Sequence, residues 1–232
     1  MMRLLLYGLQ SSGASLFAYF LAQVPDSVAV IDLWARRRRG LFRGTTPVAP
    51  RIESTGPVVV KCAVTSTVSW EQHVASFRPD RTILFLRDPL ATAASLQRKP
   101  YRRHGGSIDA KLSLIERLHR KRDGFDAVVH YEDFVDDRAG TVARIACLGW
   151  RSEPGHYGLP RGLDEVVRFA RSSSVWCDEN FGTLWDTGNI RPGAIEAAPP
   201  EGDHTEQDRE RIERLCPTLW AAYEDRRLKE GA

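Results

Sequence analysis

A short segment with the chemistry of an anion site lies at residues 8–15, where the sequence reads GLQSSGAS. An apolar run over residues 2–9 leads into it, and an apolar pattern with helical spacing follows over residues 16–23. A glycine turn between a strand and a helix directs backbone N–H groups and the positive end of the helix dipole at one point, where an anion binds. An ordinary Gly/Ser turn is the alternative interpretation of the same residues.

The spacing of this segment is that of a Walker A loop, G-x4-G-x-S, but Ala14 stands where the lysine of that loop belongs. In enzymes that hydrolyse ATP, this lysine neutralises the β- and γ-phosphates. The sequence therefore predicts a phosphate-binding loop and argues against ATP hydrolysis.

A second phosphate-binding pair is suggested by the segment RDPLATAAS, residues 87–95. Arg87 ends an expected strand, and Ser95 lies two helical turns further along an expected helix. Both side chains could hold one phosphate, the arginine by charge-assisted hydrogen bonds and the serine through its hydroxyl group. The alternative is that Asp88 caps the helix and Arg87 is a surface charge.

Two later segments complete the pattern. The sequence VVHYEDFVDD at residues 128–137 precedes an expected helix that ends ACLGW, and NIRPG at residues 189–193 lies in a long loop rich in Ser, Trp, Gly and Pro. In this order and spacing, the four segments resemble those of the sulfotransferases that use 3′-phosphoadenosine 5′-phosphosulfate (PAPS), here in a small protein of the bacterial type.

The resemblance rests on four matches. Residues 11–15 look like the first loop of the family, K/R-S-G-T-T/S, and the eight-residue spacing of Arg87 and Ser95 matches its 3′-phosphate motif. The YEDF segment at residues 131–134 matches a Y-E-D-L/F element, and RPG at residues 191–193 matches a late R-x-G element.

By this resemblance, the backbone amides of residues 12–16 and the Ser15 hydroxyl hold the 5′-phosphosulfate, while Arg87, Ser95 and Arg191 hold the 3′-phosphate. Tyr131 is expected near the adenine, with a serine-rich segment that ends in a tryptophan. The residues that the resemblance implies for donor binding are Ser11, Ser12, Gly13, Ala14, Ser15, Leu16, Arg87, Ser95, Tyr131, Ser174, Trp176, Arg191 and Gly193. Packing roles are the alternative for Tyr131 and for Trp176.

The chain departs from the family pattern at two positions. Ser11 stands where a lysine or arginine usually precedes S-G in the first loop. Residues 61–64 read KCAV where cytosolic members carry K-T-H-L, so the lysine is kept as Lys61 and the histidine that serves as the base is replaced by Ala63. Either other groups perform these tasks or the protein is inactive.

Sulfuryl transfer to a hydroxyl group needs a proton acceptor and a cation that offsets charge on the bridging oxygen. Lys61 is the expected cation, with a strand-end lysine that reaches to solvent as the alternative. Asp32, Glu71 and His73 are candidates for the base, and Asp32 ranks first because it ends an apolar strand at the edge where the first loop is expected. Its alternative role is a helix cap, and that of His73 is a half-exposed surface residue.

The elements that would position these residues alternate along the chain. Short β-branched strands are expected at residues 2–9, 27–33, 57–64, 81–86 and 127–130. Helices are expected at 16–23, 70–77, 88–97, 107–122, 139–148, 162–171 and 205–227, with a long loop at 172–200. This alternation predicts a single α/β domain over residues 1–232, with a central parallel β-sheet of about five strands flanked by helices, as in P-loop-like sulfotransferases.

The amino-acid composition argues against several classes of protein. The 232 residues are 42% hydrophobic and 27% charged, which suits a globular domain and excludes a disordered chain. The net charge of +3 does not favour a nucleic-acid coat, no apolar run is long enough to span a membrane, and no signal peptide is evident, so we expect a cytoplasmic protein. The four cysteines lack the spacing of a metal site or a disulfide framework.

These observations predict an enzyme that transfers a sulfuryl group from PAPS to a hydroxyl or amine of a small-molecule or carbohydrate acceptor. The product would be 3′-phosphoadenosine 5′-phosphate (PAP), and neither a metal, a nucleic acid nor a membrane is expected to take part. Two alternatives stay open: a non-catalytic protein that binds PAP or another anion, and a small-molecule kinase with a degenerate loop.

Overall fold

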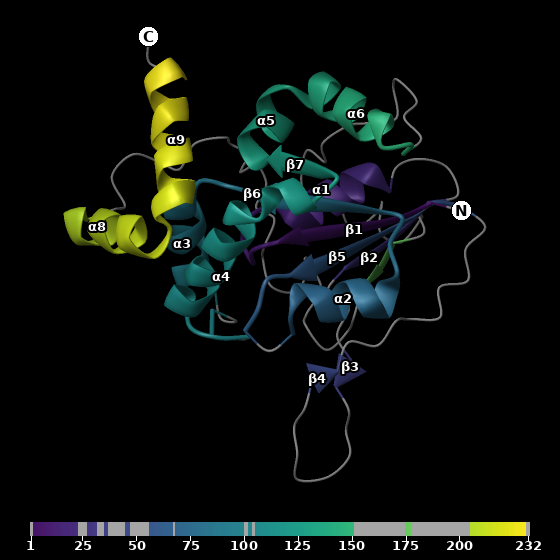
Figure 1. Cartoon of the computed structure of the whole chain (residues 1–232), viewed down its shortest axis with the longest axis horizontal. Helices are drawn as coiled ribbons and strands as arrows, with labels where there is room; N and C mark the ends of the chain where they lie inside the picture. The colour runs from purple at the N-terminus through teal and green to yellow at the C-terminus, as the bar shows by residue number, and fades with distance from the viewer. Residues whose placement is uncertain are drawn as a thin grey trace.

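The computed structural model of the chain describes residues 2–22, 27–31, 35–36, 45–46, 56–66, 68–99, 102–103, 105–150, 175–177 and 205–230. Its centre is a six-stranded sheet with the strand order β7-β6-β1-β5-β2-β8, in which every neighbouring pair is parallel (Figure 1). The strands are β1 (Arg3–Gly8), β2 (Val28–Ile31), β5 (Val58–Ala63), β6 (Arg81–Leu86), β7 (Ala127–His130) and β8 (Val175–Cys177). The α/β class with a central parallel sheet, predicted from the sequence, is confirmed.

The central strands are apolar along their whole length because helices cover both faces of the sheet. Strand β1 reads RLLLYG and β5 reads VVVKCA, and in both nearly every residue is buried. Parallel sheets covered on two sides favour such continuous runs over strict alternation. In parallel α/β sheets, ligands bind at the carboxyl ends of the strands.

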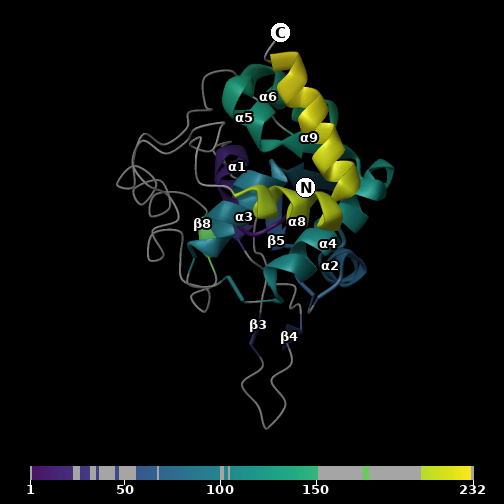
Figure 2. The ribbon, with the colours of Figure 1, turned by 90° about the vertical axis from the view of Figure 1, so that its left-hand side faces the viewer.

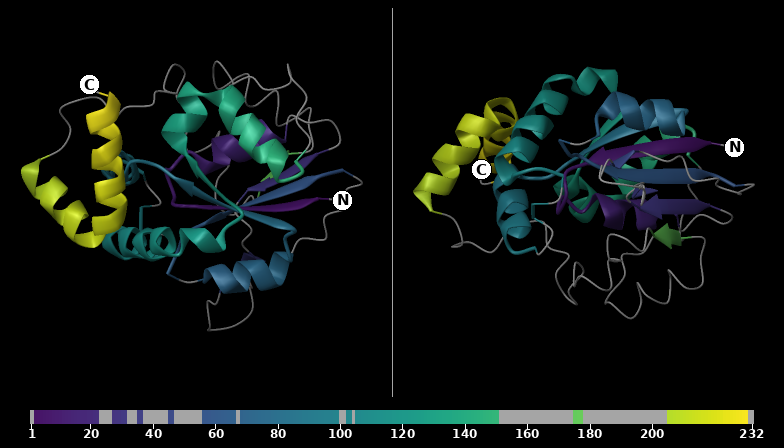
Figure 3. Two further views of the ribbon diagram at one scale, coloured as in Figure 1. Left: turned by 45° about the horizontal axis from the view of Figure 1, so that its top comes forward. Right: turned by 90° about the horizontal axis from the view of Figure 1, so that it is seen from below.

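The helices form two layers. They are α1 (Ala14–Leu21), α2 (Trp70–Phe77), α3 (Pro89–Gln97), α4 (Ile108–Arg120), α5 (Tyr131–Asp136), α6 (Arg138–Cys147), α8 (Glu206–Leu215) and α9 (Pro217–Glu230). Leu4 and Leu6 of β1 pack with α1, α5 and α6, whereas Leu5 and Tyr7 pack with α2, α4, α8 and α9. Figure 3 shows α1 and α6 on one side of the sheet and α2 and α4 on the other.

Helices α8 and α9 lie beyond the carboxyl ends of the strands (Figure 3). A short antiparallel pair, β3 (Ala35–Arg36) and β4 (Thr45–Thr46), projects away from the sheet (Figures 1 and 2). Within the described part of the chain, no helix has the length and apolarity that a membrane crossing requires.

The sequence predicts no helix or strand at α5, β3 and β4, and two further elements also differ from the expectations. Strand β8 lies inside the segment for which the sequence predicts a long loop, and it extends the sheet by pairing with residues 29–31 of β2. Three residues are too short to show the period of a strand. The expected helix at residues 162–171 lies outside the described residues.

The second difference concerns residues 205–227, predicted as one helix and found as α8 and α9. The break follows Cys216, because Pro217 has no N–H to continue the hydrogen-bond ladder and suits the first turn of a new helix. The Glu116 carboxylate of α4 accepts hydrogen bonds from the Thr218 and Leu219 N–H groups at 3.1 Å each and so caps α9. Burial alone raises the pKa of Glu116, but these bonds and one from Arg120 lower it overall.

Four phenylalanines join the sheet to the first helix layer. The Phe134 ring of α5 lies 5.0 Å from Phe17 and 4.9 Å from Phe20, both of α1, and 6.4 Å from Phe85 of β6 (centroid distances), with edge-to-face geometry in each pair. All four side chains are fully buried. This contact fixes α1 and α5, which flank the anion loop, against the end of β6.

Replacing Phe134 with alanine should lower the free energy of unfolding by about 3–5 kcal/mol, because the change removes a buried ring and leaves a cavity. Chemical denaturation monitored by circular dichroism measures this. Phe134→Leu keeps most of the volume and should cost less than half as much. Equal stability of Phe134→Ala and the wild type would show that the ring does not hold these elements together.

Candidate functional site

The anion loop begins at Gly8, the last residue of β1, which is one of the two central strands of the sheet. Gly8 pairs with Ala63 of β5 on one side and with Phe85 of β6 on the other. A Cβ atom at Gly8 would lie 3.0 Å from the Ala14 Cβ, 3.1 Å from the Phe85 carbonyl oxygen and 3.2 Å from the Ser12 Oγ. The absence of a side chain therefore lets the loop fold back tightly over the end of β1.

The loop backbone leaves amide groups available for an anion. Ser11 and Gly13 adopt left-handed conformations, with φ of 65° and 88°, and Gly13 precedes α1 without any side chain that caps the helix. The first intrahelical bond is donated by the Phe17 N–H to the Gly13 carbonyl oxygen. The N–H groups of Ala14, Ser15 and Leu16 therefore precede the hydrogen-bond ladder, as in anion sites at helix N-termini.

Polar side-chain atoms around the loop also lack partners. The Oγ atoms of Ser11 and Ser12 and the Nε atom of Arg87 are buried, and in the part of the chain that the structure describes none of them has a hydrogen-bond partner. Buried polar groups are almost always paired in folded proteins. An anion with several acceptor oxygens, such as a phosphate ester, fits this set of donors.

Arg87 joins the loop to the neighbouring elements. Its Nη1 donates to the Ser11 carbonyl oxygen at 3.2 Å, and its guanidinium group lies 4.4 Å from the centre of the Tyr131 ring. A Cβ atom at Gly13 would approach the Tyr131 ring to 2.5 Å, so the ring lies directly against the loop. The structure thus brings together Ser11, Gly13, Arg87 and Tyr131, which the resemblance assigns to the 5′-phosphosulfate, 3′-phosphate and adenine parts of one donor site.

The structure describes only some of the other residues that are expected at the 3′-phosphate and adenine sites. Ser95 is half-buried on α3, two turns after the strand end that carries Arg87. Trp176 lies in β8, where its backbone pairs with Val30. Ser174, Arg191 and Gly193 lie outside the described residues.

Among the expected catalytic residues, Lys61 is buried at 4% exposure on β5, two residues before the strand ends, and pairs with Leu6 of β1. Its side chain therefore starts on the sheet face that α1 covers, the face that also carries Leu6. Asp32 lies outside the described residues.

The two candidates after β5 lie on α2 and differ in exposure. Glu71 is exposed, and hydrogen bonds from the backbone and from Ser69 lower its pKa. His73 is only 1% exposed, its ring lies 5.4 Å from that of Tyr7, and burial lowers its pKa to about 4. The expectation of a half-exposed His73 is wrong, because the side chain faces β1 and packs in the core, and this burial favours a structural role.

Sequence reasoning missed a polar cluster behind the site. The Glu132 carboxylate accepts a hydrogen bond from the Asp88 N–H at 3.0 Å and one from the Tyr223 hydroxyl at 3.0 Å. The Nδ1 atom of His130 lies 2.9 Å from the same hydroxyl, and Arg227 forms an ion pair with Asp88. Tyr223 and Arg227 belong to α9, far along the chain, so no local pattern indicates the contact.

Burial dominates the electrostatics of this cluster. It raises the pKa of Glu132 and lowers that of His130 to about 4. It also raises the pKa of Tyr223 well above its usual range, with the nearby Glu132 charge acting in the same direction. At neutral pH the imidazole is therefore uncharged and the phenol keeps its proton.

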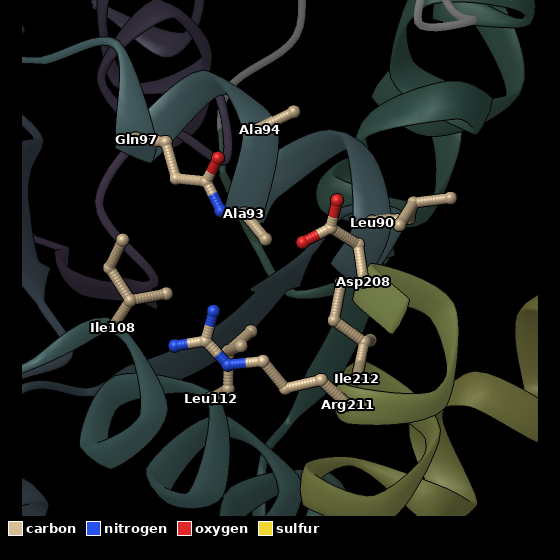
Figure 4. Close-up of a pocket in the computed structure, with 9 residues that line it drawn as sticks. All are labelled: Leu90, Ala93, Ala94, Gln97, Ile108, Leu112, Asp208, Arg211 and Ile212. Carbon is tan, nitrogen blue, oxygen red and sulfur yellow. The ribbon is translucent and has the colours of Figure 1, made fainter. Parts of the chain in front are cut away.

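Two small cavities lie near the site. One, of about 10 Å³, lies between α3, α4 and α8 and is lined by residues such as Leu90, Gln97 and Arg211 (Figure 4). The other, also about 10 Å³, borders Ser12 and Arg87. Each has room for about one water molecule, so neither is the place for a nucleotide or an acceptor.

A larger open groove of about 460 Å³ lies between α4 and the junction of α8 and α9, with Ser66 and the surface arginines Arg117 and Arg214 among its lining residues. None of its lining residues belongs to the anion loop. Among the described residues, no group of three or more His, Cys, Asp or Glu side chains is arranged to hold a metal ion.

Comparison with solved structures identifies the fold. The structure of retinol dehydratase in complex with androsterone and the inactive cofactor PAP matches with a TM-score of 0.56 at 12% identity, over 94% of this chain and 80% of that chain. Mouse sulfotransferase SULT7A1 complexed with PAP matches at 0.47 and 15% identity, over 92% and 82% of the two chains. A sulfotransferase from Alicyclobacillus acidocaldarius matches at 0.42 and 16% identity, over 74% and 92%. The match to the retinol dehydratase structure shows that the two chains share the same type of α/β fold.

Sequence comparison gives no match: no family model and no curated protein matches the chain. The fold is therefore recognised from the arrangement of its elements in space.

The buried His130 gives a prediction for the pH dependence of stability. Its pKa in the folded protein, about 4, lies below the value of about 6.5 in an unfolded chain. Below pH 6.5 the unfolded state binds a proton that the folded state rejects, so stability should fall as the pH drops from about 6.5 to about 4, with a slope of up to about 1.4 kcal/mol per pH unit from this group.

Urea unfolding at pH 7, 6 and 5 measures that slope. His130→Asn keeps an N–H donor near the position of Nδ1 but does not titrate, so its slope should be smaller than that of the wild type by up to about 1.4 kcal/mol per pH unit. Identical slopes for the two proteins would show that His130 is not held uncharged in the fold.

Proposed function

We propose that this protein is a sulfotransferase that transfers the sulfuryl group of PAPS to a hydroxyl or amine of a small-molecule or carbohydrate acceptor. The observation that carries the proposal is the anion loop at residues 8–15. Its buried serine hydroxyls have no hydrogen-bond partner among the described residues, no side chain caps the helix that follows it, and its Ser11 carbonyl accepts a hydrogen bond from Arg87. The fold supports it, because it is shared with a structure that contains PAP.

The donor would lie across the carboxyl ends of β1 and β6. In this arrangement the amides of residues 13–16 and the hydroxyls of Ser12 and Ser15 hold the 5′-phosphosulfate. The Ser12 N–H, which the resemblance also assigned to this set, instead donates to the Leu9 carbonyl oxygen. Arg87, Ser95 and Arg191 hold the 3′-phosphate. Because Tyr131 is only 4% exposed and lies under the Arg87 guanidinium, its main task would be to support that arginine.

The adenine would then fall to Ser174 and Trp176. This assignment leaves the aromatic face of Tyr131 to the arginine and the loop, which are the groups that it contacts in the structure.

PAPS supplies the sulfuryl group, and the protein residues neutralise charge and remove a proton. Lys61 would offset the charge that forms on the bridging oxygen, as a cation near a developing oxyanion does. The loop has Ser11 where the family has a cation, so on this assignment the loop binds the 5′-phosphosulfate through its amides and hydroxyls. Asp32 would accept the proton of the acceptor.

Two other functions fit less well. A kinase needs a lysine in the loop, and this chain has Ala14 at that position. A protein that binds PAP without catalysis would share the loop geometry. Incubation with PAPS separates it from the enzyme, because only the enzyme releases PAP and a sulfated acceptor over time.

Replacing Arg87 with alanine should weaken PAP binding by about 30- to 800-fold, because a charge-assisted contact to a dianionic phosphate is worth about 2–4 kcal/mol. Ser95→Ala should weaken it by about fivefold, since one neutral hydrogen bond is lost. Isothermal titration calorimetry with PAP and with adenosine 5′-phosphosulfate, which lacks the 3′-phosphate, gives both values. The second ligand should be affected far less by Arg87→Ala.

Arg81→Ala is the matched control, because Arg81 starts the strand that leads to Arg87 and is exposed at the opposite end of it. It should bind PAP as the wild type does. If Arg87→Ala and Arg81→Ala bind PAP equally well, Arg87 does not hold the 3′-phosphate.

Replacing Asp32 with asparagine should lower kcat by about 100-fold or more, the usual effect of losing a general base, with PAP affinity within about twofold. The rate is measured as PAP released from PAPS with a panel of alcohol and phenol acceptors. Glu71→Gln is the control from the other candidate region and should keep the wild-type rate. A normal rate for Asp32→Asn together with an inactive Glu71→Gln would move the base to α2.

A further inference from the structure

We propose that the C-terminal helix α9 positions Arg87 for binding the 3′-phosphate, through Tyr223 acting on Glu132 and through Arg227 acting on Asp88. The inference rests on the proposed function and adds to it two positioning residues from a part of the chain that lies outside every matched motif. It starts from the polar cluster behind the anion loop, which the chemistry proposed above does not use.

The Glu132 carboxylate links the two segments that carry Arg87 and Tyr131. One carboxylate oxygen, Oε1, accepts from the Asp88 N–H at 3.0 Å, and Asp88 directly follows Arg87. Glu132 itself directly follows Tyr131, whose ring supports the Arg87 guanidinium at 4.4 Å. A displacement of this carboxylate would therefore change the position of Arg87 relative to the ring and the loop.

Tyr223 fixes the carboxylate from the other side. Its hydroxyl donates to Glu132 Oε2 at 3.0 Å, so both oxygens of the carboxylate are held. The hydroxyl oxygen can then accept from the Nδ1–H of His130, 2.9 Å away, and the lowered pKa of His130 keeps that imidazole neutral. The phenol is 3% exposed, so water cannot replace it as the donor without rearrangement.

Arg227 makes the second contact of the same helix face. It lies four residues after Tyr223, on the same side of α9, and forms an ion pair with one oxygen of Asp88. The other oxygen, Oδ1, accepts from the Leu90 and Ala91 N–H groups at 2.7 and 3.1 Å and caps α3. Helix α9 thus acts on Asp88 in two ways. Its Arg227 binds the Asp88 carboxylate, and its Tyr223 holds the Glu132 carboxylate that accepts from the Asp88 N–H.

A neighbouring contact of α9 supplies the matched control. Arg226 forms an ion pair with Asp133, which also pairs with Arg144 of α6. This pair joins α9 to α5 and α6 and has no contact with Asp88 among the bonds of the described residues. The Arg226 guanidinium also lies 5.8 Å from the centre of the Tyr223 ring. Its loss should weaken the attachment of α9 but leave the hydrogen bond from the Tyr223 hydroxyl to Glu132 in place, and with it the position of Arg87.

The test compares Tyr223→Phe with Arg226→Gln by calorimetry, using PAP and adenosine 5′-phosphate as ligands. Tyr223→Phe removes only the hydroxyl, and it should weaken PAP binding by about tenfold while changing the affinity for adenosine 5′-phosphate by less than about twofold. Arg226→Gln should keep the wild-type ratio of the two affinities, even if its melting temperature falls. An unchanged ratio in Tyr223→Phe would overturn the inference.

A second readout does not depend on the ligand. Exchange of the amide hydrogens of Arg87, Asp88, Leu90 and Ala91 should accelerate in Tyr223→Phe and in Arg227→Gln, and stay as in the wild type in Arg226→Gln. Arg227 is partly exposed, so its variant serves if Tyr223→Phe does not fold. If wild-type protein fails to bind PAP, the proposed function fails. The hydrogen-exchange experiment tests the positioning role even in that case, because it needs no ligand. Equal amide exchange rates in the wild type and in all three variants would refute the positioning role.

Discussion

The arrangement of this protein depends on the contact in which the Arg87 guanidinium lies between the Ser11 carbonyl and the Tyr131 ring. Three separate parts of the chain meet there: the loop after β1, the end of β6 and the start of α5. They meet because β1, β6 and β7 are neighbours in a parallel sheet, which places their carboxyl ends at one edge. The contact in turn holds the Arg87 guanidinium at the loop that precedes α1.

The loop at this contact concentrates polar groups that the described residues do not pair. Buried donors without partners are costly, and they persist where a ligand completes them. Two buried serine hydroxyls, an uncapped helix and a guanidinium group together favour a multiply charged anion. The left-handed conformation of Ser11 also indicates a functional site, because backbone strain in non-glycine residues is concentrated at such sites.

In the polar cluster behind the loop, by contrast, the carboxylates already have hydrogen-bond or ion-pair partners. Glu132 is held at both oxygens, and Asp88 caps α3 while pairing with Arg227. A satisfied buried network resists displacement, whereas a partly satisfied one does not. The fold thus combines a rigid support, built largely from α9, with a binding loop whose donors remain available.

The sequence predicted those features whose signals are local. The glycine loop, the β6 strand at 81–86 and the α2 helix at 70–77 follow from apolar patterns and turn residues, and the structure has them at the expected residues. Contact between the loop and Arg87 could be expected from the geometry of parallel sheets. The burial of His73 could not, because its polar neighbours on α2 hide that its own side chain faces β1.

The contact of Tyr223 with Glu132 could not be predicted either. It joins residues 91 positions apart, and it depends on the direction in which α9 runs from its start at Pro217. A single sequence has no local period or motif that reports such a contact, and the same holds for the ion pair of Arg227 with Asp88, 139 positions apart.

The most direct test of the central claim is a crystal structure of the protein with PAP. The account predicts the 5′-phosphate within hydrogen-bonding distance of the amides of residues 13–16 and the 3′-phosphate on the Arg87 guanidinium. PAP bound elsewhere, for example in the groove between α4 and the α8–α9 junction, or an anion loop without any phosphate at saturating PAP, would contradict it.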